Sequence, residues 1–133
     1  MSTQARTKSD LSSDEINNYS VAHFIVSNAL ALCREKLLAQ ENNAEDPASQ
    51  DNYRAARSNI EANLELMKSI RLRFNHGRSK VLPPDTELIR SLALGSAKVA
   101  GCACDPARLP EVMELTGEII SKLRTLQTCD NLL

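Results

Sequence analysis

The stretch INNYSVAHFIVSNALALCREKLL, residues 16–38, decides the fold class of this chain. Side chains suited to one packed face recur in it at alternating spacings of three and four residues, along Ile16, Tyr19, His23, Val26, Leu30, Cys33 and Leu37. This spacing keeps them on one side of an α-helix, because about 3.5 residues complete a turn of a packed helix. No charged residue occurs from Asn17 to Cys33, so this helix is apolar around most of its circumference and is expected to be central to the fold.

A second run with the same spacing follows a polar break, along Tyr53, Ala56, Ile60, Asn63, Met67, Ile70 and Phe74. The break ends at Asp46-Pro47, a pair that is typical of an N-cap followed by the first residue of a helix. Gly77 fits the position just after a helix end. Two long helices with matching stripes and a short connection predict an antiparallel hairpin, with helices at about residues 13–41 and 47–76.

Two shorter helices are predicted at about residues 85–101 and 110–128. Pro83-Pro84 closes the loop before the first of them, because a helix interior does not tolerate this pair. The predicted fold is all-α: an antiparallel four-helix bundle of up-down topology, built on the long hairpin. It forms one domain, residues 13–133, after a disordered tail of residues 1–12 that lacks apolar periodicity.

Composition restricts the class of protein. The chain has 133 residues, 42 % of them hydrophobic, and a formal net charge of −1, so no global attraction to nucleic acid or to an anionic membrane is predicted. Polar residues interrupt the apolar stretch of the first helix, so no membrane span is expected. The polar, acid-bearing N-terminus is unlike a targeting signal, and the four cysteines fit a reducing compartment. A cytoplasmic location is expected.

His23 is the most unusual residue on the first stripe. In a hairpin that turns at residues 44–46 it would face Asn63 or Met67, and a buried His23–Asn63 hydrogen bond would fix the register. The alternative is a phosphoacceptor histidine, which needs a solvent-facing ring with a basic neighbour and small residues nearby. The apolar residues 24–26 beside it favour burial.

Five cations with no intervening acid surround the end of the second predicted helix: Lys68, Arg71, Arg73, Arg78 and Lys80. They could form a patch for phosphate, RNA or an acidic partner surface. The alternative is a set of solvated cations at the negative end of the helix dipole. An acidic row that begins the last helix could meet them within or between chains: Glu111, Glu114 and Glu118.

Cys102 and Cys104 are the only clustered thiols. A C-x-C pair could supply two zinc ligands or a redox pair, but a structural zinc site needs four ligands, usually in paired clusters. The other cysteines and histidines stand alone in the sequence. No metal and no cofactor are therefore expected.

For catalysis the sequence offers no glycine-rich phosphate loop, no nucleophile motif and no metal-binding helix motif. We expect a non-enzymatic protein that acts through protein–protein interaction, as an adaptor, a regulator, a small chaperone or an immunity-type partner. The two long helices would extend beyond the two short ones, so a homodimer is expected to cover the remaining apolar surface. The alternatives are a nucleic-acid-associated regulator that uses the basic patch, and a thiol- or metal-dependent sensor.

Overall fold

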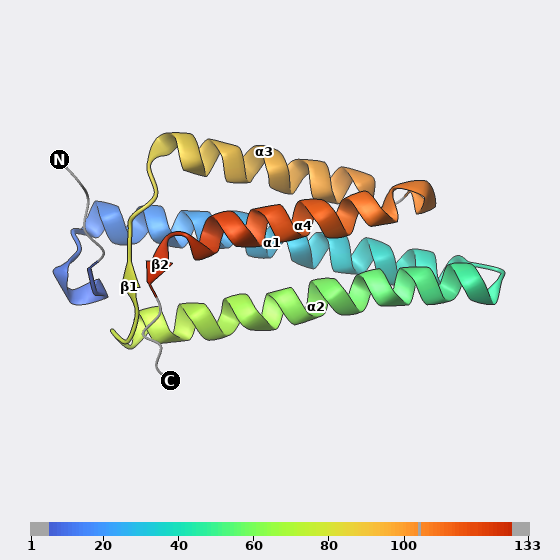
Figure 1. Cartoon of the computed structure of the whole chain (residues 1–133), viewed down its shortest axis with the longest axis horizontal. Coiled ribbons are helices and arrows are strands. Elements are labelled where there is room, and N and C mark those ends of the chain that lie inside the picture. Colours follow the sequence, from blue (N-terminus) through green and yellow to red (C-terminus); the bar gives the residue numbers. More distant parts are fainter. Residues whose placement is uncertain (1–5, 104, 129–133) are drawn as a thin grey trace.

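The computed structural model describes residues 6–103 and 105–128. Within these residues lie four α-helices: α1 (Ser13–Asn43), α2 (Pro47–Asn75), α3 (Thr86–Cys102) and α4 (Leu109–Arg124). They pack side by side along a common direction, as Figure 1 shows. The prediction of an all-α four-helix bundle is confirmed, and the limits of the first three helices agree with the predicted ones to within two residues.

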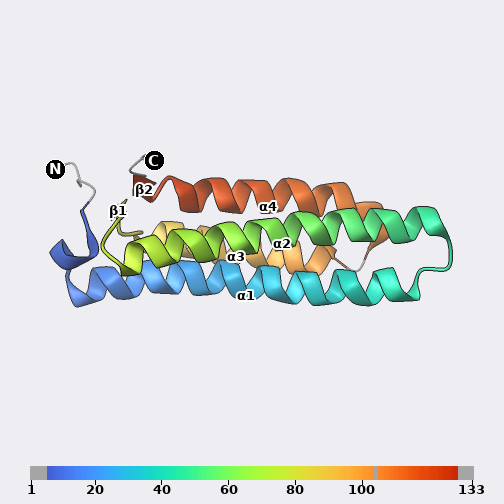
Figure 2. The same ribbon diagram turned by 90° about the horizontal axis from the view of Figure 1, so that it is seen from below.

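Around the bundle the helices follow one another in the order α1, α2, α4, α3. Figures 1 and 2 show α1 and α2 side by side in opposite directions, with α3 against α1 and α4 against α2 and α3. Helices α2 and α3 lie across the diagonal, so the chain between them crosses one end of the bundle. That crossing carries β1 (Lys80–Val81), which pairs antiparallel with β2 (Gln127–Thr128) after α4. Helix α4 was predicted to reach residue 128, but it ends at Arg124 because residues 127 and 128 pair with β1.

Local sequence sets the helix ends. The Ser12 hydroxyl accepts a hydrogen bond from the Glu15 N–H at 3.1 Å, and the Glu15 carboxylate accepts one from the Ser12 N–H at 3.0 Å, a reciprocal capping box that starts α1. The Asp46 carboxylate caps α2 by accepting from the Ser49 N–H at 2.9 Å. At the end of α2, Gly77 has φ +72°, a conformation that glycine adopts without strain.

The main core runs along the bundle axis. Five of its fully buried side chains come from the predicted stripe of α1 and its inner flank: Ala22, Val26, Leu30, Cys33 and Leu37. Helix α3 approaches α4 at Gly95, where a Cβ atom would lie 3.3 Å from Ile119 Cγ1. The absence of a side chain at Gly95 therefore lets the two helices come close.

A second, smaller core closes the end of the bundle where the chain crosses from α2 to α3. It consists of Leu11, Tyr19, Phe74 and Val81. The Tyr19 and Phe74 rings pack with their centroids 4.0 Å apart.

At this end of the bundle the structure differs from the predicted disordered tail of residues 1–12. Residues 6–12 are described by the structure and are not a free tail: Arg6 exchanges backbone hydrogen bonds with Val81 at 3.0 and 2.9 Å, and residues Lys8–Asp10 form a 3-10 turn, η1. The Arg6 guanidinium also pairs with the Glu15 carboxylate. Residues 6–12 pack against the bundle because Leu11 buries its side chain in the small core. No periodic apolar pattern surrounds Leu11 in the sequence. Residues 1–5 lie outside the described range.

The burial of Leu11 predicts a loss of stability when its side chain is truncated. We expect Leu11→Ala to lower the free energy of unfolding by about 2 kcal/mol, the lower end of the range for a buried leucine, since the cluster is small and lies at an end. Urea denaturation of both proteins measures the difference. A change below about 0.5 kcal/mol would show that the Leu11 side chain does not stabilise the fold as its burial indicates.

The hairpin tip lies beyond the two short helices. Figure 1 shows α1 and α2 extending past α3 and α4 at the end where they are joined. There Glu41 is buried between Arg54 and Arg57, each of which donates to its carboxylate at 2.9 Å. The hydrogen bond from Arg57 is the largest cause that lowers the pKa of Glu41; burial opposes it, and the hydrogen bond from Arg54 adds to the lowering. Ion pairs thus cover part of the seam that α3 and α4 do not reach.

Candidate functional site

Helix α1 carries three of the large apolar side chains that are exposed among the described residues. Phe24 is 67 % exposed, Leu32 49 % and Leu38 38 %. Phe24 and Leu38 project from one side of α1, next to the buried stripe, whereas Leu32 projects roughly 100° farther around the helix. We call Phe24 and Leu38, together with the half-buried Ser20 and Ser27 on the same side of the helix, the α1 face. Since the helix has no charge from Asn17 to Cys33, nothing in that stretch keeps a second apolar surface away.

A shallow pocket of about 440 Å³ opens beside Phe24, between α1 and α2. It is lined by Ser20, Val21, His23, Phe24, Ser27 and Arg71. The Arg71 guanidinium donates to the Ser20 hydroxyl at 3.4 Å. Its positive charge therefore lies at the edge of an otherwise uncharged helix face.

His23 lies on the buried side of this pocket. Its ring is 2 % exposed and packs 4.6 Å from the Tyr19 ring, and no described residue bonds to its Nδ1 atom. Burial, and after it the charge of Arg71, lower the pKa of His23 to about 4, so the imidazole is neutral at pH 7. The expected burial is observed. A phosphoacceptor needs an accessible ring, and this one is covered.

The predicted His23–Asn63 hydrogen bond is wrong. The Asn63 amide donates to the Asn59 carbonyl at 3.0 Å, within α2. Tyr19 packs on Phe74, and the Ser20 hydroxyl accepts a hydrogen bond from Arg71. These contacts place His23 opposite a part of α2 that lies about one helical turn closer to the C-terminus of α2 than a hairpin connection at residues 44–46 predicts. Asn63 instead lines a pocket together with residues of α4.

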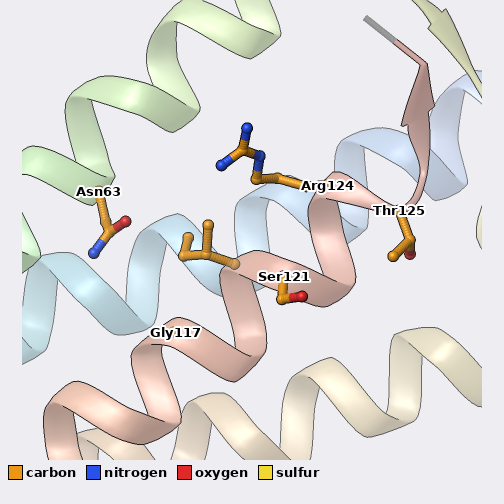
Figure 3. Close-up of a pocket in the computed structure, with 6 residues that line it drawn as sticks. Asn63, Gly117, Ser121, Arg124 and Thr125 are labelled. Atoms are coloured by element: carbon orange, nitrogen blue, oxygen red, sulfur yellow. The ribbon is translucent and has the colours of Figure 1, made fainter.

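Figure 3 shows where Asn63 lies: in a second pocket, of about 400 Å³, between α2 and α4. The Arg124 side chain extends from α4 toward α2, and Asn63 points from α2 toward α4. The rest of the lining comes from α4 and its end: Gly117, Ile120, Ser121 and Thr125. One cation, one amide and two hydroxyls can bind a polar group, but they include no pair of groups for acid–base chemistry.

The structure divides the predicted basic patch. Lys68, Arg73 and Arg78 line one surface pocket on the outward side of α2, together with His76 and the 52 % exposed Leu72. Arg71 instead belongs to the pocket beside His23. Lys80 lies on β1 and does not line the pocket that Lys68, Arg73 and Arg78 share. Residues 71 and 73 point in different directions because they are two positions apart on a helix.

The predicted thiol pair is only half described. Cys102 is buried, and its thiol donates to the Glu111 carboxylate at 3.7 Å. Burial is the largest cause that raises the pKa of Cys102, which disfavours the reactive thiolate. Cys104 lies outside the described residues. Within residues 6–103 and 105–128, no group of three or more His, Cys, Asp or Glu side chains is placed to hold a metal ion.

Comparison of the chain with models of protein families, with curated proteins and with solved structures gave no match. None of the described helices is long and apolar enough to cross a membrane.

The site residues that sequence reasoning missed are Phe24 and Leu72. Each is a large apolar residue placed off the buried stripe of its helix, directly after His23 and Arg71 respectively. Their signal in the sequence is a large apolar side chain at a position outside the stripe, next to a histidine or an arginine.

Proposed function

We propose that this protein is a non-enzymatic interaction protein that self-associates through the α1 face. The exposed Phe24 carries the proposal: its phenyl ring is two-thirds exposed in a stretch of α1 that has no charged residue, so a second apolar surface can pack on it without burying a charge. A copy of the same face can cover it, because a two-fold dimer places identical patches against each other. The small Ser20 and Ser27 on either side of Phe24 allow the backbones of two helices to come close.

The hairpin geometry supports the proposal. Helices α1 and α2 extend past α3 and α4, so the bundle does not cover its longest helices over their full length (Figure 1). Leu38, near the tip, belongs to the α1 face and is one of the side chains left exposed. A second copy would bury this surface without needing a charged contact in the centre of the interface.

We expect light scattering at micromolar concentration to give twice the chain mass of 14.6 kDa. Phe24→Glu should give the monomer mass, because each dimer would bury two unpaired carboxylates. The matched control is Leu94→Glu on α3, since Leu94 is 68 % exposed but lies outside the α1 face. This control should remain dimeric. A wild-type mass of 14.6 kDa, or equal behaviour of the two variants, would contradict the proposal.

A further inference from the structure

A second surface combines cations with an exposed apolar side chain. We call it the Leu72 patch: Lys68, Leu72, Arg73, His76 and Arg78, which line one pocket of about 360 Å³ on the outward side of α2. Ser69 and Glu65 complete the lining. The patch lies at the end of the bundle that holds the small core, on a different helix from the α1 face.

The fold does not use these cations to close the helix. The last turn of α2 is satisfied by backbone groups: the His76 N–H donates to the Leu72 carbonyl at 3.0 Å, and the Gly77 N–H to the Phe74 carbonyl at 3.0 Å. The Arg78 N–H donates to the Arg73 carbonyl at 2.8 Å. These bonds form the Schellman arrangement, so the carbonyls that cations often cap already have partners.

The cations also lack strong acidic partners within the chain. Neither Arg73 nor Arg78 forms an ion pair in the part of the chain that the structure describes. Lys68 has Glu65 at 3.8 Å, but both side chains are at least 70 % exposed, and such a pair contributes little. The acidic row of α4 cannot reach them within one chain, because α4 begins at the opposite end of the bundle (Figure 1).

We propose that the Leu72 patch binds an acidic segment of a partner protein. An apolar side chain of that segment would pack on Leu72, and flanking carboxylates would pair with Arg73, Arg78 and Lys68. Charge complementarity favours an acidic partner, and the central Leu72 favours a peptide over a nucleic acid. The aliphatic Leu72 at its centre offers a base neither a hydrogen bond nor a ring to stack on, and Glu65 would repel phosphates. With the α1 face, the chain would then have two separate interaction surfaces, as an adaptor needs.

The test uses fluorescence anisotropy of a fluorescein-labelled octapeptide with Phe-Leu at its centre and Glu and Asp at the other positions. We expect saturable binding that weakens as salt is raised. Arg73→Glu combined with Arg78→Glu should weaken it at least tenfold, and Leu72→Ser at least threefold. All three positions are exposed, so circular dichroism should show unchanged helix content.

Two controls separate the patch from general charge effects. Arg90→Glu combined with Lys98→Glu changes the net charge by the same amount on α3, and it should alter peptide affinity less than twofold. A peptide with Gln and Asn in place of Glu and Asp should not bind. Phe24→Glu should bind the acidic peptide like the wild type, so a failure of self-association and a failure of peptide binding are distinguishable.

Three results would overturn the inference. The first is the absence of saturable binding at protein concentrations up to 200 µM. The second is an equal loss of affinity in the α3 control. The third is tight binding of a decauridine RNA that depends on Arg73 and Arg78 but not on Leu72, with no binding of the peptide, which would assign the patch to nucleic acid.

Discussion

Lowering the pH from 6.5 to 4 is expected to reduce the free energy of unfolding by roughly 3 kcal/mol through His23 alone. The unfolded chain takes up a proton on this imidazole near pH 6.5, whereas the folded chain, with a pKa of about 4, does not. The loss of stability through His23 therefore begins near pH 6.5, grows as the pH falls to 4, and is constant below pH 4. Urea denaturation at a series of pH values measures it.

The control for this prediction is His23→Leu, which removes the titrating group and nearly keeps the volume. Carboxylates with lowered pKa values, such as Glu41 and Asp46, also make the protein less stable in acid, but they do so equally in the wild type and in the variant. The difference between wild type and variant thus isolates His23. Since Asn63 bonds to Asn59, the substitution leaves no buried amide without a partner, and the variant should be about as stable as the wild type at pH 7. The same pH dependence in both proteins would refute a buried, neutral His23.

Phe74→Ala should lower the free energy of unfolding by about 3–5 kcal/mol, the range for truncating a buried aromatic residue. Phe74 is 1 % exposed and joins α2 to α1 through Tyr19, and to the crossing segment through Val81. Its removal leaves a cavity in a cluster too small to collapse around it. Denaturation must be compared at one protein concentration, because self-association would add stability that depends on concentration.

Leu94→Ala is the matched control for Phe74→Ala. Leu94 is also a large apolar residue, but it is exposed on α3, so its truncation should change stability by less than about 0.5 kcal/mol. Equal losses in the two variants would show that the small core at the end of the bundle does not contribute to stability as its burial indicates.

The sequence by itself determined the helices and most of their ends. The stripes at spacings of three and four, the capping Asp46 and the Gly77 stop all act within one or two turns, so a local pattern is enough to identify them. The burial of His23 follows from the same stripe. The exposure of Phe24 does not, because it depends on which faces of α1 the other helices cover.

Only the tertiary structure decided the register of the hairpin and the order of the helices. Tyr19 packs on Phe74, and this contact displaces His23 from Asn63 by about one turn, an amount that the length of the connecting turn does not specify. Leu11 becomes buried only when α1, α2 and the crossing segment meet. Such choices depend on side chains that are distant in sequence and fill one space together, because close packing selects among registers that the periodicity of each helix allows equally.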